Sequence, residues 1–439
     1  MSPARSPADW VAHLRSGGTT PWPAFRDGAP ADPAGPADPA VPADPALRRA
    51  DPTRSRAERM THAGEAEGPV GARHADPTPP RAERTTHDAG HPRHFPGAQQ
   101  LELLRRLTLA AGQPVPAALA DRVLSAGTTG RGHPDLDLVG AAGAPDPRGD
   151  SRGETRGVDP TALPAEELLR VAVGLLAEDL AATPPPTVEA PVWSVLLRRR
   201  YRVVGDPRLA DPVREELARR GRTIGGRDAR VLVLGTGTEQ MLADAWVSRF
   251  LDVGAPPWTA WLAEWAGRDA VPTRVDLAAA ARTWAGRAGT RRLVVVLDPT
   301  ALPRLVRSRT LPAPPDPVPA HAAELARRVA EVLGLLVEPR RREVLVGRTL
   351  LPWVAAVARR ADPLAPPPGV PPRLRPWLER SARRLHDEVF AGGYPVVGDP
   401  ERLLDDHEGV VPTTAGALDV AIAALLGGGP ADLPGGGPA

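Results

Sequence analysis

Glycine and threonine alternate in one short segment whose residue types suit the binding of an anion. Residues 230–240 read R-V-L-V-L-G-T-G-T-E-Q, an apolar run followed by a turn and the start of an amphipathic stretch. This order predicts a strand, a turn and a helix, and the free backbone N–H groups at a helix N-terminus favour a phosphate. The glycines permit a tight turn, and the hydroxyls can cap the helix or donate to the anion. The candidate binding residues are Gly235, Thr236, Gly237 and Thr238.

Two features of the chain argue against a nucleotide at this segment. Glu239 follows at once, where its charge suits the helix dipole but opposes a bound phosphate. All 55 basic side chains are arginine, and lysine, asparagine and cysteine are absent. Codon bias in a high-GC genome accounts for this composition, which still excludes Schiff-base lysines and the lysine that grips phosphates in Walker loops. It also excludes disulfides, thiolate nucleophiles and cysteine-based metal sites.

A second candidate for anion binding follows another apolar run. Residues 293–310 read L-V-V-V-L-D-P-T-A-L-P-R-L-V-R-S-R-T, so Arg304 and Arg307 come shortly after a predicted buried strand. Parallel sheets bind anions beyond the carboxyl ends of their strands, and guanidinium groups there favour phosphate or sulfate. The alternative is that both arginines cover the rim of a helix with their aliphatic stems.

The two tyrosines of the chain open nearly the same string. Y-R-V-V-G-D-P begins at Tyr201 and Y-P-V-V-G-D-P begins at Tyr394. Each string predicts a short strand that ends at glycine, after which Asp206 or Asp399 caps a helix and proline takes its first position. A duplication or a paired site is the alternative interpretation.

Histidines and tryptophans gather in two other regions. Half of the ten histidines fall in residues 62–94, but a segment rich in proline and glycine does not fix metal geometry, so we expect no metal site. Trp258, Trp261 and Trp265 share one face of a predicted helix. That spacing indicates core packing, with an aromatic ligand wall as the alternative.

The charge balance bears on partners and on location. The net charge is +2 because 53 carboxylates nearly balance the arginines, so the sequence argues against nucleic-acid binding. No apolar run is long enough to span a membrane and the N-terminus lacks a secretory signal, so we expect a soluble, cytoplasmic protein without a membrane partner.

The pattern along the chain divides it into folded and low-complexity parts. Residues 1–26 carry a short helix, and the tripeptide A-D-P recurs in residues 27–95, which we expect to be a disordered linker. Residues 96–183 predict helices around an internal linker at 127–157. Residues 184–427 alternate strand-like runs, including 192–197, with helices such as 344–359, and residues 428–439 form a flexible tail. The expected fold class is therefore α/β, with a mostly parallel sheet preceded by a small helical region.

Residues 230–404 resemble bacterial sulfotransferase-like proteins of the P-loop fold. In that family a strand precedes K-T-G-T-T, which binds the 5′-phosphosulfate of the donor; here Gly235 stands at the lysine position and Glu239 at the last threonine. A second family motif, R-x-P followed by serine, holds the 3′-phosphate; here Leu297 replaces the arginine and Ser308 lies further along. G-G-Y-P-V-V-G-D-P from residue 392 is similar to a closing string of bacterial members.

The resemblance and the altered motifs together predict a diverged P-loop-like domain with a non-catalytic binding or interaction role. No cofactor is expected in that case. The partner would be a protein that contacts the N-terminal helix and the linker. The alternative is a sulfo- or phosphoryl-transferase that uses arginine in place of lysine, and its donor would be adenosine 3′-phosphate 5′-phosphosulfate.

Overall fold

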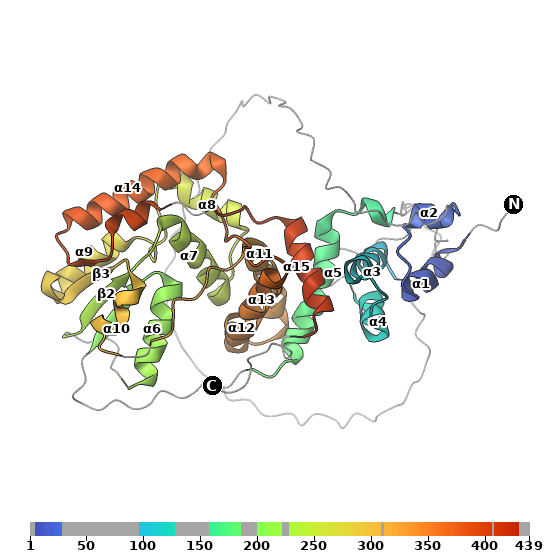
Figure 1. The fold of residues 1–439 in the computed structure, drawn as a ribbon, viewed down its shortest axis with the longest axis horizontal. Coiled ribbons are helices and arrows are strands. Elements are labelled where there is room, and N and C mark those ends of the chain that lie inside the picture. Colours follow the sequence, from blue (N-terminus) through green and yellow to red (C-terminus); the bar gives the residue numbers. More distant parts are fainter. Residues whose placement is uncertain are drawn as a thin grey trace, which may run out of the picture. The chain divides into compact units, whose positions relative to one another are not determined.

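The computed structural model describes residues 5–28, 96–127, 158–185, 200–221, 228–308, 311–405 and 408–429 (Figure 1). These residues form an α/β fold with an all-parallel sheet in the C-terminal half and a small helical region before it, as the sequence predicted. Most of the expected linkers at 27–95 and 127–157, the expected strand at 192–197 and most of the tail lie outside the described residues.

The described sheet contains four strands in the order in which they occur in the chain. Each predicted strand within these residues is confirmed. The bounds are β1 Tyr201–Gly205, β2 Arg230–Leu234, β3 Leu293–Val296 and β4 Val396–Val397. Their valine-rich sequences suit a parallel sheet that is buried on both faces. Val203 lies beside Leu232, and Val233 lies beside Val295, so every carboxyl end meets the same edge.

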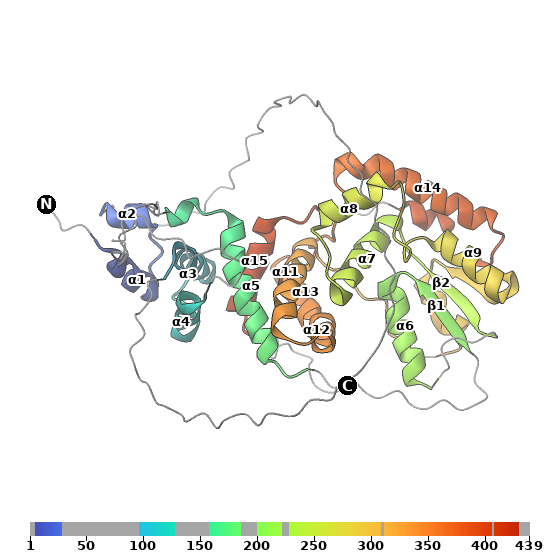
Figure 2. The same cartoon turned by 180° about the vertical axis from the view of Figure 1, so that it is seen from behind.

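Helices cover both faces of the sheet (Figures 1 and 2). Because side chains alternate along a strand, Leu232 and Leu234 face one way while Val231 and Val233 face the other. The first pair packs against α6 (Pro207–Arg219) and α10 (Leu302–Leu305). The second pair packs within the core that contains α7 (Thr238–Asp252) and α9 (Leu277–Ala288). The same core holds α8 (Trp258–Gly267) and α14 (Arg375–Ala391), with Trp258 and Trp261 buried as their spacing predicted.

The remaining helices form a bundle beside the sheet. The N-terminal helices are α1 (Pro7–Arg15), α2 (Trp22–Arg26), α3 (Ala98–Ala111), α4 (Ala117–Ser125) and α5 (Ala165–Ala182). α5 packs against α11 (Ala320–Leu336) and α15 (Thr414–Leu426). α15 is apolar on several faces and is missing from the helices that the sequence predicted; Thr413 caps it. Short 3₁₀ turns span Pro160–Ala162, Thr290–Arg292, Pro299–Ala301, Pro372–Leu374 and Pro400–Leu404.

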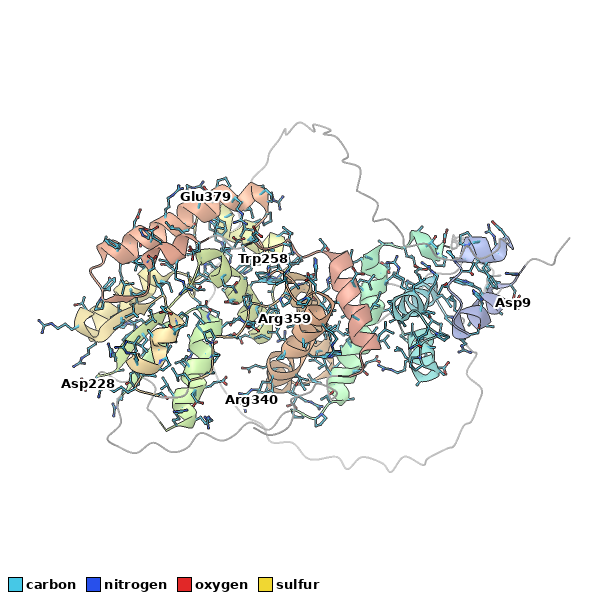
Figure 3. All side chains as sticks on the ribbon, viewed as in Figure 1. Asp9, Asp228, Trp258, Arg340, Arg359 and Glu379 are labelled. Carbon is cyan, nitrogen blue, oxygen red and sulfur yellow. The ribbon has the colours of Figure 1, made fainter. Side chains whose placement is uncertain are left out.

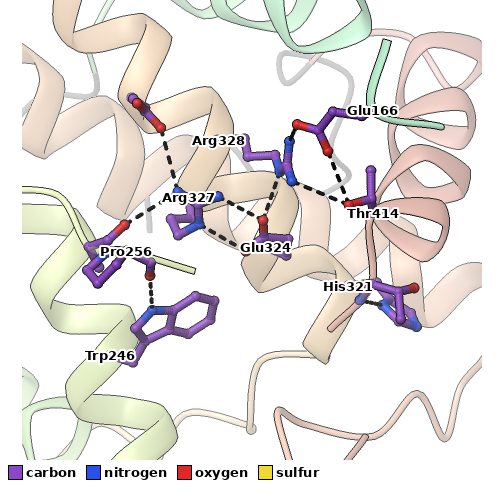
Figure 4. Close-up of polar contacts among 11 residues, drawn as sticks. Glu166, Trp246, Pro256, His321, Glu324, Arg327, Arg328 and Thr414 are labelled. Atoms are coloured by element: carbon purple, nitrogen blue, oxygen red, sulfur yellow. Dashed lines mark hydrogen bonds and ion pairs between the residues drawn. The ribbon is translucent and has the colours of Figure 1, made fainter. Parts of the chain in front are cut away.

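A buried carboxylate joins the bundle helices (Figure 4). Glu324 of α11 accepts hydrogen bonds from Arg327 at 2.8 Å and 2.9 Å and from Arg328 at 2.8 Å. Arg328 also pairs with Glu166 of α5, which accepts a bond of 3.2 Å from the hydroxyl of Thr414. The spacing E-L-x-R-R places two guanidinium groups on one carboxylate, because residues three and four apart share a helix face.

The predicted helix at 344–359 is interrupted. α12 (Pro339–Leu345) leads into a π-helical turn, Val346–Leu350, and α13 (Leu351–Ala361) follows. Pro352 has no N–H to donate to the preceding turn, and the N–H of Leu351 donates to Val346 five residues back. This turn of the helix therefore contains one residue more than an α-helical turn.

Candidate functional site

The carboxyl ends of the strands carry a repeated string. β1 ends in V-V-G-D-P, β3 in V-V-L-D-P and β4 in V-V-G-D-P. The aspartates of these strings each accept a bond from a backbone N–H two residues on, at 2.9 Å, 3.0 Å and 3.0 Å for Asp206, Asp298 and Asp399. The predicted caps at Asp206 and Asp399 are therefore confirmed. The carboxylates of Asp298 and Asp399 cap the 3₁₀ turns that begin at Pro299 and Pro400.

The segment 235–238, which we call the Gly/Thr turn, follows β2 and leads into α7. Its first glycine is packed rather than open, because a Cβ on Gly235 would lie 2.2 Å from Cδ1 of Leu277. The N–H of Gly235 donates to the carbonyl of Val296 at 3.0 Å. Glycine here permits close packing of α9 on the sheet.

The chain itself covers the end of the Gly/Thr turn. The hydroxyl of Thr238 donates to the carbonyl of Leu403 at 2.7 Å, and this contact is buried. A Cβ on Gly237 would lie 3.2 Å from the carbonyl oxygen of Asp405. Arg402 fastens the same covering segment to the sheet by donating to the carbonyl of Leu297 at 3.0 Å.

Glu239 is held at the N-terminus of α7 by two strong contacts. Its side chain is 0% exposed, and one carboxylate oxygen pairs with Arg375 at 2.7 Å. The other oxygen accepts a hydrogen bond of 2.7 Å from the N–H of Val370. Glu239 therefore places a buried, anchored carboxylate in the first turn of α7, where the helix dipole favours negative charge.

A small pocket of about 320 Å³ lies beside this helix N-terminus. Thr238 and Glu239 form one wall, and α14 contributes Glu379 and Arg383 (Figure 3). With Asp405 the lining contains more carboxylates than guanidinium groups. That balance opposes a phosphate, which carries negative charge itself.

Arg304 and Arg307 do not join the Gly/Thr turn. Both are exposed, on α10 and the turn after it, and neither lines the pocket beside Thr238. Their neighbours Leu302 and Val306 pack on the sheet face that α6 covers, whereas α7 belongs to the opposite face. Ser308, of the second family motif, is buried and accepts a bond of 2.7 Å from Arg220. The candidate residues therefore form two separate sets.

A groove of about 800 Å³ lies beside the carboxyl end of β1. Its walls come from α6, the end of α7, residues 315–318, α12, the π-helical turn and α13. Four guanidinium groups and five carboxylates line it among prolines and aliphatic side chains, so the lining combines apolar surface with charges of both signs. The charged residues are Arg208, Arg340, Arg348, Arg359, Asp211, Glu215, Asp252, Asp316 and Glu343. Figure 3 labels Arg340 and Arg359. The sequence pattern did not predict this groove.

The wall formed by α12 is fixed from inside by one buried arginine. Arg342 donates to the carbonyls of Phe250 at 2.7 Å, Leu251 at 2.8 Å and Ala330 at 2.9 Å. The carbonyls of Phe250 and Leu251 lie in the last turn of α7, where carbonyls have no N–H partner within the helix. The carbonyl of Ala330 lies within α11 and accepts Arg342 as a second donor. The groove therefore has a rigid side.

Two buried carboxyl groups lie next to the groove. Asp206 is 0% exposed and Asp244 of α7 is 6% exposed. Burial is the main cause that raises the pKa of both groups, and it raises that of Asp244 to about 6. Arg208, which lines the groove, approaches Asp244 with Nε at 3.3 Å. The sequence marked Asp206 only as a cap, and no local pattern marks Asp244, since the two positions meet only through the fold.

Within the described residues, no group of three or more histidines and carboxylates is arranged to hold a metal ion. The histidine-rich residues 62–94 lie outside them. No described helix combines the length and apolar character required to cross a membrane. No protein-family model, curated protein or solved structure matches the chain.

Proposed function

We propose that this protein acts by binding a ligand or partner and does not transfer a group from a nucleotide donor. The observation that carries the proposal is the anchored carboxylate of Glu239, a fixed negative charge in the first turn of α7. The sulfotransferase-like resemblance then describes a shared arrangement of strand, turn and helix without the donor site. The groove between α6 and α12 is the binding surface in this proposal.

The energetic cost of admitting a phosphate at the Gly/Thr turn supports this view. A phosphate there would add negative charge near the buried carboxylate of Glu239, which could withdraw only by leaving Arg375 and the N–H of Val370. Breaking a buried ion pair costs about 3 kcal/mol or more. That cost corresponds to roughly a hundredfold weaker binding, before the loss of the Thr238 bond to Leu403 is counted.

The groove, in contrast to the Gly/Thr turn, has the position and the exposed side chains of a binding surface. It lies beside the start of α6, which follows the carboxyl end of β1, and ligands of α/β proteins bind beyond the carboxyl ends of the strands. Arg340 is exposed in the groove wall, and the π-helical turn places Gly347 and Arg348 in the lining. Turns of that kind occur often at functional sites.

Titration of the full chain with nucleotides tests the absence of a donor site. Millimolar Mg-ATP and adenosine 3′,5′-bisphosphate should leave the melting temperature unchanged, because only a ligand that binds the folded state raises it. A dose-dependent rise that Arg304→Ala or Arg307→Ala abolishes would contradict the proposal and support the transferase alternative.

A photo-crosslinking residue placed at Arg340 tests the groove. A matched probe at Glu264, exposed on α8 and outside the groove lining, serves as the control. In cells that express the full chain, the probe at position 340 should give defined adducts and the probe at position 264 should not. Adducts from position 264 alone would show that binding occurs elsewhere.

A further inference from the structure

The buried carboxyl pair, Asp206 and Asp244, is joined to the groove by a single arginine. The Asp206 carboxylate accepts from the N–H of Arg208 at 2.9 Å and so caps α6. The Arg208 side chain lies 3.3 Å from Asp244 and donates to the carbonyl of Asp316 at 2.9 Å. Asp316 belongs to the segment 315–318 in the groove wall. One side chain therefore contacts both the carboxyl pair and the groove.

The burial of the pair favours a shared proton. Asp206 and Asp244 are both buried and interact with each other, yet ionised carboxylates only accept hydrogen bonds. Oδ2 of Asp206 is buried and has no hydrogen-bond partner when both groups are taken as ionised. A proton between the two groups supplies the missing donor.

The surroundings of the pair provide one positive charge, which can balance only one ionised carboxylate. Arg208 of α6 is the positive group that acts on the pair, and Gln240 of α7 contributes a neutral hydrogen bond. The side chain of Asp316 is 81% exposed, so its own charge lies in solvent. Two ionised carboxylates would thus repel each other in a buried place with one guanidinium between them.

We propose that Asp206 and Asp244 share one proton at mildly acidic pH, and that loss of this proton as the pH rises loosens the first turn of α6 and releases residues 315–318 from Arg208. We call Asp206, Asp244 and Arg208 the latch, because in the protonated state Arg208 holds residues 315–318 in the groove wall. The first turn of α6 is the part that yields, because Asp206 caps it and cannot move away from Asp244 without breaking that cap. The latch regulates ligand binding only if the groove is the binding surface proposed above, but its opening is a property of the free chain.

Hydrogen exchange of the free full chain between pH 5 and pH 8 tests the latch, after correction for the intrinsic pH dependence of exchange. In the wild type, protection of the first amides of α6 should fall by roughly tenfold as the shared proton is lost. Asp244→Asn should abolish this fall, because an amide donates to Asp206 at every pH. Asp252→Asn removes an exposed groove carboxylate and should leave the fall intact.

Asp206→Asn provides a second variant, since asparagine also caps helices well. It too should remove the pH dependence, and it keeps the test decisive if Asp244→Asn does not fold. Constant protection in the wild type, or an unchanged fall in both asparagine variants, would overturn the proposal. Failure of the crosslinking experiment at Arg340 would leave this result untouched, so the two proposals fail separately.

Discussion

The anchored carboxylate of Glu239 leads to a stability prediction that can be worked out from the structure. Replacing Glu239 with alanine removes the contact to Arg375 at 2.7 Å and the acceptor of the Val370 N–H at 2.7 Å. Val370 is buried, so its N–H is left without an acceptor, whereas Arg375 keeps 29% of its side chain exposed and can be solvated again. An unsatisfied buried donor costs about 1–3 kcal/mol, and a charge-assisted hydrogen bond contributes about 1.5–3 kcal/mol.

The expected loss of stability is therefore about 3 kcal/mol, at the lower end of the range for a broken buried ion pair because Arg375 is partly exposed. In a folded unit of this size each kcal/mol shifts the melting temperature by about 2 °C, so Glu239→Ala should melt about 6 °C lower. Glu239→Gln should lose less, since the amide oxygen still accepts from Val370. Differential scanning calorimetry with a urea titration measures both quantities.

Glu379→Ala is the matched control. Glu379 is an exposed carboxylate of α14 that lines the same pocket, and its removal should change the free energy of unfolding by less than about 0.5 kcal/mol. A double-mutant cycle with Arg375→Ala should return a coupling energy of about 1 kcal/mol or more. If Glu239→Ala is as mild as Glu379→Ala, the carboxylate does not hold the start of α7 and the reasoning about this fixed negative charge is wrong.

Three further outcomes are expected. Asp244→Asn should match the wild type near pH 4 and be more stable than the wild type by up to about 3 kcal/mol at pH 8. The reason is that folding raises the pKa of Asp244 from 3.8 to about 6, so the stability of the wild type falls as pH rises through that window. Parallel urea titrations check this, and identical pH profiles of the two proteins would contradict it. Arg342→Met should cost about 3 kcal/mol, since the carbonyls of Phe250 and Leu251 lose their donor, and it should increase hydrogen exchange in α12; unchanged exchange there would refute the role of Arg342. Trp10→Ala should cost about 3 kcal/mol in calorimetry because the indole is fully buried and donates to Thr20 at 2.9 Å, and a loss below about 1 kcal/mol would show that α1 is not docked in solution.

Local elements were predictable because their causes are local. Ser6 caps α1 with both bonds of a capping box, Asp206 and Asp399 cap the turns that follow V-V-G-D-P, and valine runs form the strands within the described residues. α15 escaped prediction because its apolar residues surround the helix, which removes the periodic pattern that marks a helix with one exposed face. The π-helical turn also escaped, since a helical pattern with one proline does not show where the hydrogen bonds shift.

The candidate site depended on contacts between distant positions. The segment 230–240 has the strand, turn and helix that its residues predicted, and the opposition of Glu239 to a phosphate stays a prediction. The partners that decide the chemistry are Leu403, which accepts from Thr238, and Arg375, which pairs with Glu239; they lie 165 and 136 residues away along the chain. No local pattern ties such positions together. Arg304 and Arg307, the second candidate for anion binding, lie with the helices on the other face of the sheet.

The sequence by itself determined the residue types that are available and the local elements that they form. An all-arginine set of basic side chains removed lysine chemistry, and Gly/Thr spacing and Asp-Pro caps shaped the strand ends, because turns and caps involve neighbours within a few residues. Only the tertiary structure decided what each strand end faces. Burial and long-range pairing put Arg375 on Glu239 and Asp244 near Asp206, so a carboxylate of the chain is fixed in the first turn of α7 and a groove of about 800 Å³ lies beside β1.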